Sequence, residues 1–193
     1  VIHLEDDTIL HPQFFEFMHQ ALERYENQPR IFSVSGYKRR ANQRTAGLML
    51  TEDWGGNNVG LQAIFSCWGW GTWRRVWEEV KDEWFGIHWK GNKYPGEVHG
   101  QNFMDNIVKN PKGSWAHPMN LHWRGQRFEI VPDESLVQNI GVAHSTFAAG
   151  LRSVLHHTDS FDTTCIYDGW DFDMVDMELS ALRPRKDDRP VEW

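Results

Sequence analysis

The sequence predicts an α/β protein in which a mostly parallel sheet is flanked by helices. Residues 1–4 and 31–37 are apolar stretches typical of strands, and the second alternates with small polar residues. Between them, apolar side chains recur at the spacing of one helix face: Phe14, Met18, Leu22 and Tyr25. A strand, a helix and a second strand within 37 residues are typical of a parallel crossover, the repeating unit of α/β folds.

Prolines, glycines and caps define the other elements. Pro12 suits the first turn of the helix, which we expect from about residue 12 to residue 27. A polar and then glycine-rich stretch at 38–60 is typical of a long surface excursion. Thr72 is a natural N-cap. The later elements are expected to be helices at 72–80, 99–108 and 114–123 and a strand at 128–132.

The composition excludes several classes of function. The chain has 193 residues, which allows one domain or at most two, and its 13% aromatic content disfavours disorder. A net charge of −7 disfavours nucleic acid as a partner, and no run of about 18 uncharged apolar residues could span a membrane. Cys67 and Cys165 form no CxxC motif, so we expect no disulfide framework and a cytoplasmic location, which is compatible with peripheral membrane association.

Three adjacent carboxylates follow the first predicted strand. Glu5, Asp6 and Asp7 stand where that strand ends, and ligands of open α/β sheets bind at the carboxyl ends of strands. Adjacent carboxylates repel one another, and a divalent cation such as Mg²⁺ or Mn²⁺ removes that repulsion. The triplet therefore predicts a site for a metal or a polar ligand. The alternative is a solvated turn that caps the next helix.

The order of several short motifs resembles that of a known family, the metal-dependent glycosyltransferases of the GT-A fold. Leu4 to Asp7 looks like the Glu-Asp-Asp form of their acidic motif. In bacterial members of the superfamily it is followed by motifs that stand here, in the same order, at Trp68–Arg75, Ser114–Trp115 and Leu136–Gly141. Residues 12–15 and 31–36 are also similar to the Golgi N-acetylglucosaminyltransferases.

The resemblance implies an inverting transfer of a sugar from a nucleotide-sugar donor to a hydroxyl of a carbohydrate or glycan acceptor. Asp7 would bind Mn²⁺ or Mg²⁺ bridging the donor diphosphate, while Glu5 and Asp6 would orient the sugar or the ribose. His144 is a candidate further metal ligand, and the alternative for it is a hydrogen-bonded loop residue.

Inverting transfer also needs a carboxylate base that accepts the proton of the acceptor hydroxyl. Many relatives carry an aspartate directly after the Ser-Trp motif, where this chain has Ala116. We therefore expect the base at Asp105, on a predicted helix, with Glu97 as the alternative. An exposed helix carboxylate without a catalytic role is the competing interpretation of Asp105.

Glycines alternate with tryptophans in one segment of this tryptophan-rich chain. Gly69 and Gly71 would let the backbone approach a ligand, and Trp68 or Trp70 could stack on a donor or acceptor sugar. We interpret this segment as a ligand-facing loop; the alternative is that its tryptophans pack in the core. The high tryptophan content also keeps a second function open, a non-catalytic carbohydrate-binding or interaction module.

The resemblance divides the chain into two parts. Residues 1–150 are expected to be the catalytic, acceptor-side part of a Rossmann-like GT-A domain, and 151–193 an acidic, loosely structured extension. The sequence starts inside a strand at Val1, without an initiator methionine. We therefore expect it to be the C-terminal part of its domain, lacking the half that binds the nucleobase.

Overall fold

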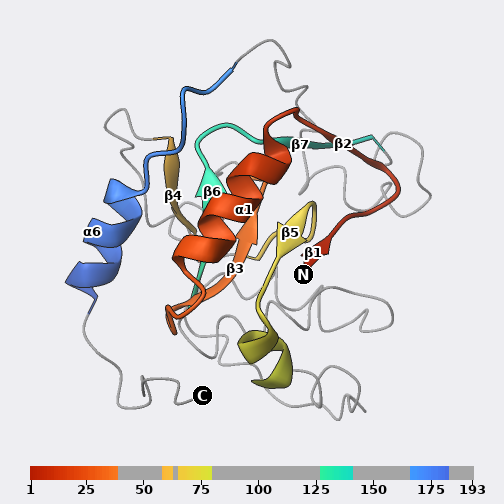
Figure 1. Ribbon diagram of the computed structural model, residues 1–193. Helices are drawn as coiled ribbons and strands as arrows, with labels where there is room; N and C mark the ends of the chain where they lie inside the picture. Colours follow the sequence, from red (N-terminus) through yellow and green to blue (C-terminus); the bar gives the residue numbers. More distant parts are fainter. Residues whose placement is uncertain (39–57, 63–64, 80–126, 141–165, 183–193) are drawn as a thin grey trace, which may run out of the picture.

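The computed structural model describes residues 1–38, 58–62, 65–79, 127–140 and 166–182, and Figure 1 shows how they are arranged. Their elements are β1 Ile2–His3, β2 Thr8–Leu10, α1 Phe14–Arg24, β3 Ile31–Ser35, β4 Val59–Gln62, β5 Trp70–Gly71, β6 Phe128–Pro132, β7 Val137–Asn139 and α6 Asp173–Ala181. Residues 74–79 are also helical, as expected. The helices predicted at 99–108 and 114–123 lie outside the described residues.

The main sheet is mixed, with the strand order β1-β5-β3-β6-β4. In the described part of the chain, three of its four neighbouring pairs are antiparallel, and only β3 and β6 pair in parallel. The α/β class is therefore confirmed, and the prediction of a mostly parallel sheet is wrong. The reason is β5, which lies between β1 and β3 and is antiparallel to both. A strand of two residues, one of them glycine, carries too little alternation to be predicted.

Three strands nevertheless share one direction. Since β5 is antiparallel to both β1 and β3, these two strands run the same way, and β6 runs with them. The predicted unit of strand, helix and strand therefore has the expected direction, although its two strands are not neighbours. The carboxyl ends of β1, β3 and β6 consequently lie at one edge of the sheet.

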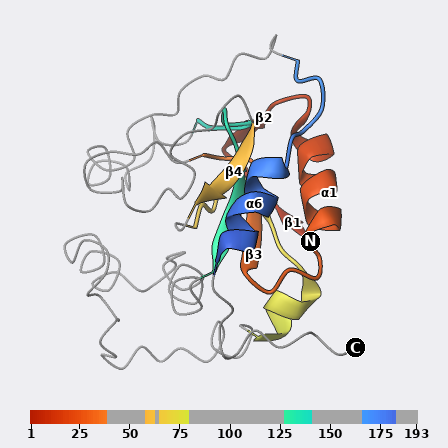
Figure 2. The same cartoon turned by 90° about the vertical axis from the view of Figure 1, so that its left-hand side faces the viewer.

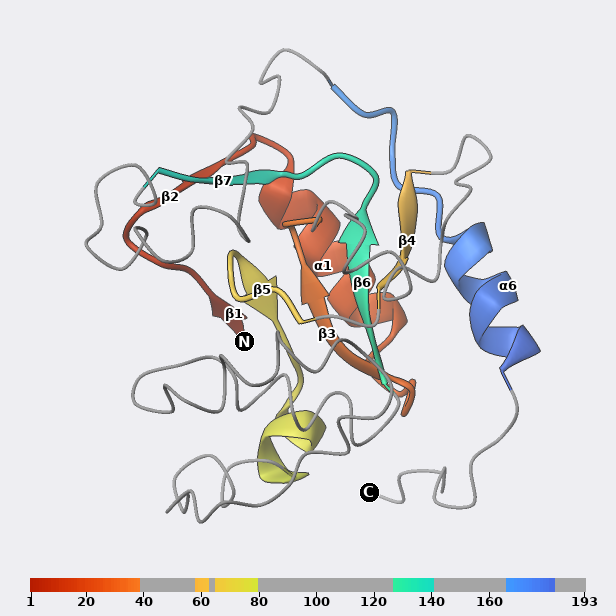
Figure 3. The same ribbon diagram turned by 180° about the vertical axis from the view of Figure 1, so that it is seen from behind.

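Helix α1 covers one face of this sheet (Figures 1 and 3). It is shorter than the predicted helix at both ends. Its buried side chains are Phe14, Phe17, Met18 and Ala21, which include two positions of the predicted apolar stripe. They pack with the sheet in one continuous hydrophobic core, so the position of the helix follows from the apolar spacing in its sequence.

A second, two-stranded sheet crosses the carboxyl ends of the parallel strands. It consists of β2 and β7, which pair antiparallel from Thr8 opposite Asn139 to Leu10 opposite Val137. Figure 3 shows this ribbon above the ends of β3 and β6. The Leu136 N–H, directly before β7, donates to the carbonyl of Gly36 at 2.7 Å. This bond attaches the small sheet to the end of β3.

The described part of the C-terminal region, residues 166–182, packs on the core. Phe172 and Val175 are buried. Helix α6 lies beside β4, the last strand of the main sheet (Figures 1 and 2). The side-chain amide of Gln13 donates to the Tyr167 carbonyl and accepts from the Tyr167 N–H, at 2.9 and 2.7 Å. The expectation of loose structure is therefore wrong for these residues, because apolar side chains spaced through an acidic segment still bury.

Candidate functional site

The acidic triplet forms the turn between β1 and β2. The carbonyl of Glu5 accepts hydrogen bonds from the Thr8 hydroxyl at 2.7 Å and from the Thr8 N–H at 3.3 Å, which closes the turn. The carbonyl of Asp7 accepts from the N–H of Ile140, just beyond β7, at 2.8 Å. The backbone of the triplet is therefore held from both sides at the edge where β1, β3 and β6 end.

One atom of this turn is unusual. The Oδ1 atom of Asp7 is buried and has no hydrogen-bond partner among the described residues, whereas Asp6 is exposed to solvent. A carboxylate oxygen that has lost its hydration without gaining a donor is unfavourable by about 1–3 kcal/mol or more. Such groups in native proteins call for an explanation, and a bound cation is one.

The described carboxylates around Asp7 are too few to form a metal cage of protein ligands. Within residues 1–38, 58–62, 65–79, 127–140 and 166–182, no group of three or more His, Cys, Asp or Glu side chains could hold a metal ion. Mg²⁺ bound with phosphates is commonly held by one or two carboxylates, and water and substrate oxygens supply the rest. The donor set of Glu5, Asp6 and Asp7 fits that second kind of site.

Lys38, which follows β3, pairs with Asp133, which follows β6. Lys38 Nζ donates to the carbonyl and to the Oδ1 atom of Asp133, both at 2.9 Å. The hydroxyl of Ser135 accepts from the Lys38 N–H at 3.1 Å and donates to the Lys38 carbonyl. These bonds hold the two strand ends together, so the sheet edge beside the acidic turn is tightly connected.

Several residues predicted from the sequence cannot be compared with the structure. Asp105, Glu97 and His144 lie outside the described residues, as does the Ser114–Trp115 motif. Their roles as base and metal ligand therefore stay predictions. The structure places Glu5, Asp6 and Asp7 together at the predicted edge of the sheet.

The tryptophans of the segment in which tryptophan and glycine alternate, Trp68 and Trp70, lie in the core. Trp68 and Trp70 are 8% and 7% exposed. The ring of Trp70 packs edge-on against Phe65 at 4.9 Å between centroids, and Trp68 packs in the same way against Tyr37 at 4.7 Å. The interpretation of this segment as a ligand-facing loop is wrong for these two side chains, whose aromatic faces are covered by protein.

The glycines of this segment also have a packing role. Gly69 has φ of +59°, and a Cβ added there would lie 2.6 Å from Cγ2 of Val137. A Cβ on Gly71 would lie 2.9 Å from Cε of Met18 in α1. From the sequence we expect these glycines to let the backbone approach a ligand. Close approach of helix α1 and strand β7 requires them instead.

Sequence reasoning missed a buried carboxylate in β6. Glu129 is fully buried and accepts hydrogen bonds from the Ser33 hydroxyl at 2.8 Å, the Gln62 amide at 2.6 Å and the Ser66 N–H at 2.8 Å. It joins β3, β4 and the segment that leads to β5. Its signal in the sequence is a single acidic residue within the otherwise apolar stretch Phe128–Pro132.

Arg75, the last residue of the Trp68–Arg75 motif, has a structural role. Arg75 is 7% exposed, and its guanidinium donates to the carbonyls of Glu26 and Gln28, between α1 and β3, and of Ile31, the first residue of β3. It also lies 4.6 Å from the ring centre of Trp73. Burial lowers the pKa of Arg75 to about 10. The helix at 74–79 is thereby fastened to the loop after α1.

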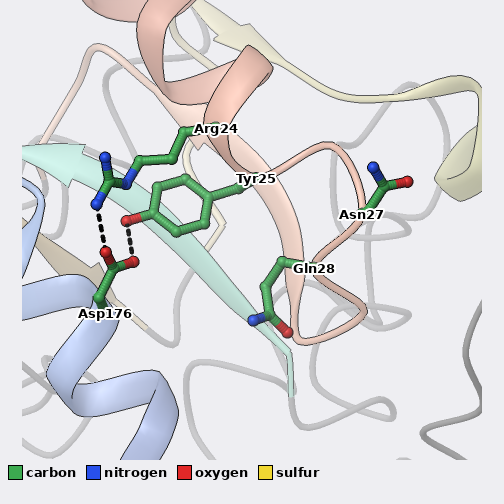
Figure 4. A pocket seen from close by; sticks show the side chains of 5 residues that line it. All are labelled: Arg24, Tyr25, Asn27, Gln28 and Asp176. Atoms are coloured by element: carbon green, nitrogen blue, oxygen red, sulfur yellow. Dashed lines mark hydrogen bonds and ion pairs between the residues drawn. The ribbon is translucent and has the colours of Figure 1, made fainter.

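A pocket of about 380 Å³ lies at the opposite end of α1 from the acidic turn (Figure 4). Its lining residues are Arg24, Tyr25, Asn27, Gln28 and Asp176. Asp176 of α6 accepts hydrogen bonds from Arg24 and from the Tyr25 hydroxyl, the latter at 2.8 Å. Burial, and then the bond to Asp176, raise the pKa of Tyr25. Arg24, Tyr25 and Asp176 therefore bind each other and attach α6 to α1.

Comparisons of the sequence with protein-family models and with curated proteins found no match. Within the described parts of the chain, no helix has the length and apolar character needed to cross a bilayer. The functional argument therefore rests on the acidic turn itself.

Proposed function

We propose that this chain is the acceptor-side part of a divalent-metal-dependent glycosyltransferase, which moves a sugar from a nucleotide-sugar to an acceptor hydroxyl with inversion. The observation that carries the proposal is the buried Oδ1 atom of Asp7, which has no hydrogen-bond partner among the described residues. It belongs to a turn at the sheet edge where ligands of α/β proteins bind. The motif order described above supplies the choice of reaction.

The candidate carboxylates and His144 each have a role in this proposal. Asp7 binds Mn²⁺ or Mg²⁺, with His144 as a candidate further ligand, and Glu5 and Asp6 orient the donor. When bound, the cation supplies positive charge that stabilises the diphosphate leaving group. Asp105, or else Glu97, accepts the proton from the acceptor hydroxyl as the sugar is transferred.

The geometry gives less support to a non-catalytic carbohydrate-binding module. Such a module presents aromatic faces on its surface, where they stack on sugar rings. Trp68, Trp70 and Trp73 are each no more than 8% exposed, whereas Trp77 is 37% exposed. Of these four side chains, only that of Trp77 could stack on a sugar, so the second function has less support than transfer.

Calorimetric titration of Mn²⁺ into the full chain tests the proposal. The titrations are made without nucleotide and with the diphosphates of uridine, guanosine and cytidine in turn. We expect Mn²⁺ to bind with at least one of them, and Asp7→Asn to weaken that binding by about 100-fold or more. A lost outer-shell partner has a smaller effect, about 10–100-fold.

Asp133→Asn is the matched control, because it removes the same charge at the same edge of the sheet from a carboxylate that Lys38 already pairs. It should leave the binding of Mn²⁺ unchanged within about threefold, since separate sites act independently. Equal affinity in the wild-type chain and in Asp7→Asn would reject the proposed role of Asp7.

A further inference from the structure

We infer that Gly69 is a positioning residue for the carboxylate of Asp7 and acts on it through Val137 of β7. The inference concerns how the acidic turn is held. It rests on the proposed function only for what Asp7 binds. The evidence is a close contact between Gly69 and β7, followed by backbone hydrogen bonds from β7 to Asp7.

The contact depends on the absence of a side chain. Gly69 has φ of +59°, a conformation that residues with a side chain rarely adopt. A Cβ there would lie 2.6 Å from Cγ2 of Val137 and 3.0 Å from Cε2 of Phe14. Gly36, whose N–H donates to the carbonyl of Gly69 at 2.9 Å, would bring its own Cβ to 3.0 Å from the same methyl. The Val137 side chain therefore rests on two glycine backbones.

From Val137, paired backbone leads directly to the acidic turn. Val137 stands opposite Leu10, and the β2 and β7 ladder continues to Thr8 opposite Asn139. One residue further, the Ile140 N–H donates to the carbonyl of Asp7 at 2.8 Å. A displacement of β7 by a new methyl on Gly69 would therefore be transmitted to Asp7, because packed cores respond to added volume by shifting backbone.

The other glycine of the same segment is different. A Cβ on Gly71 would meet Met18 and Leu22 of α1 and the carbonyl of Val1. No atom of β7 is among its three nearest neighbours. Gly71 thus brings β5 close to the helix, whereas Gly69 sets the height of the β2 and β7 ribbon above the sheet. Two residues apart, the two glycines have separate roles.

Hydrogen exchange in the full chain, without metal or nucleotide, tests this inference. In Gly69→Ala we expect the Ile140 amide to exchange at least about tenfold faster relative to amides of the β4 and β6 ladder, because the ribbon opens locally. Gly169→Ala is the matched control, since Gly169 also has a positive φ, +88°, and its Cβ would meet nothing within 4 Å. It should leave that ratio unchanged.

The same substitution in a Val137→Ala chain shows whether the effect comes from the contact with Val137 or from strain in the backbone of residue 69. In Val137→Ala, which lacks Cγ2, the added effect of Gly69→Ala should fall below about threefold, as expected when two residues interact directly. If Gly69→Ala does not fold alone, the same comparison is made between Val137→Ala and the double variant. Equal acceleration in both ladders, or an undiminished effect in the Val137→Ala background, would overturn the inference.

Titration with Mn²⁺ and the same three nucleoside diphosphates then separates the two proposals. Gly69→Ala should weaken metal binding by about tenfold, the scale of a displaced supporting residue. Faster exchange at Ile140 together with metal binding that Asp7→Asn does not weaken would reject the proposed function and leave the positioning role standing. Weakened binding in Asp7→Asn with unchanged exchange in Gly69→Ala would reject the positioning role of Gly69 and support the proposed function.

Discussion

Two carboxylates of this protein, Asp7 and Glu129, lie in regions with opposite polar environments. Glu129 is in the middle of the sheet, fully buried, and three donors bind its oxygens. Asp7 is at the edge of the sheet, only half-buried, and one of its oxygens is buried without a donor among the described residues. The comparison teaches that burial of an acid does not by itself indicate function. Whether the buried oxygens have partners is the more informative property.

The largest expected effect is on stability, at Glu129. Glu129→Ala leaves the Ser33 hydroxyl, the Gln62 amide and the Ser66 N–H without their acceptor and opens a cavity between strands. We expect the free energy of unfolding to fall by about 3 kcal/mol or more, as measured by urea denaturation. A decrease in the free energy of unfolding below about 1 kcal/mol, the size of one ordinary hydrogen bond, would show that the three donors find other acceptors in the variant.

The next effect is on turnover and concerns the base. Asp105→Asn should retain donor and metal binding and lower the turnover number by about 100-fold, the usual scale for a lost general base. The measurement is sugar transfer to an acceptor under saturating donor. Full activity in this variant with a comparable loss in Glu97→Gln would move the base to Glu97.

A smaller effect is expected at the contact between α1 and α6, where a third acid, Asp176, is fully engaged (Figure 4). The pKa of Tyr25 is raised in the folded chain, so folding favours its neutral form. Its contribution to stability is complete below the ordinary tyrosine pKa of about 10 and is lost as the pH rises above it.

Tyr25→Phe should therefore lower the free energy of unfolding by about 1 kcal/mol at pH 7, the value of one hydrogen bond. Between about pH 10 and pH 11 the difference from the wild-type chain should shrink, because only the wild-type chain loses this contribution. Urea denaturation at both pH values measures the difference. If the difference in the free energy of unfolding between the two chains grows with pH, the raised pKa of Tyr25 is contradicted.

The comparison of regions also explains what the sequence could predict. The strand at 31–35, helix α1 and the position of the acidic triplet were all predictable, because apolar spacing and the end of a strand are local properties. The mixed sheet was not, since β5 has two residues and pairs with strands far away in the chain. Pairing over such distances depends on packing that no local pattern encodes.

The site was predictable to the same limited extent. The carboxylates of the triplet are identified from the sequence, but Gly69 and Gly71 are interpreted there as serving a ligand, together with Trp68 and Trp70. In the structure the two glycines instead allow close contact with Val137 and Met18, which are 68 and 53 positions away from Gly69 and Gly71. Contacts of this kind are visible only once the chain is folded, and Glu129 was missed for the same reason.

The most direct test of the central claim compares the stability of Asp7→Ala with and without ligand. Without ligand, removal of a buried oxygen that lacks a partner should leave the free energy of unfolding unchanged or raise it by up to about 1 kcal/mol. With Mn²⁺ and the nucleoside diphosphate that binds, at about 100 times the wild-type Kd, the wild-type chain should gain about 2.7 kcal/mol and Asp7→Ala no more than about 0.4 kcal/mol. An equal gain in both chains, or an unliganded Asp7→Ala that is strongly destabilised, would contradict the assignment of Asp7 to function.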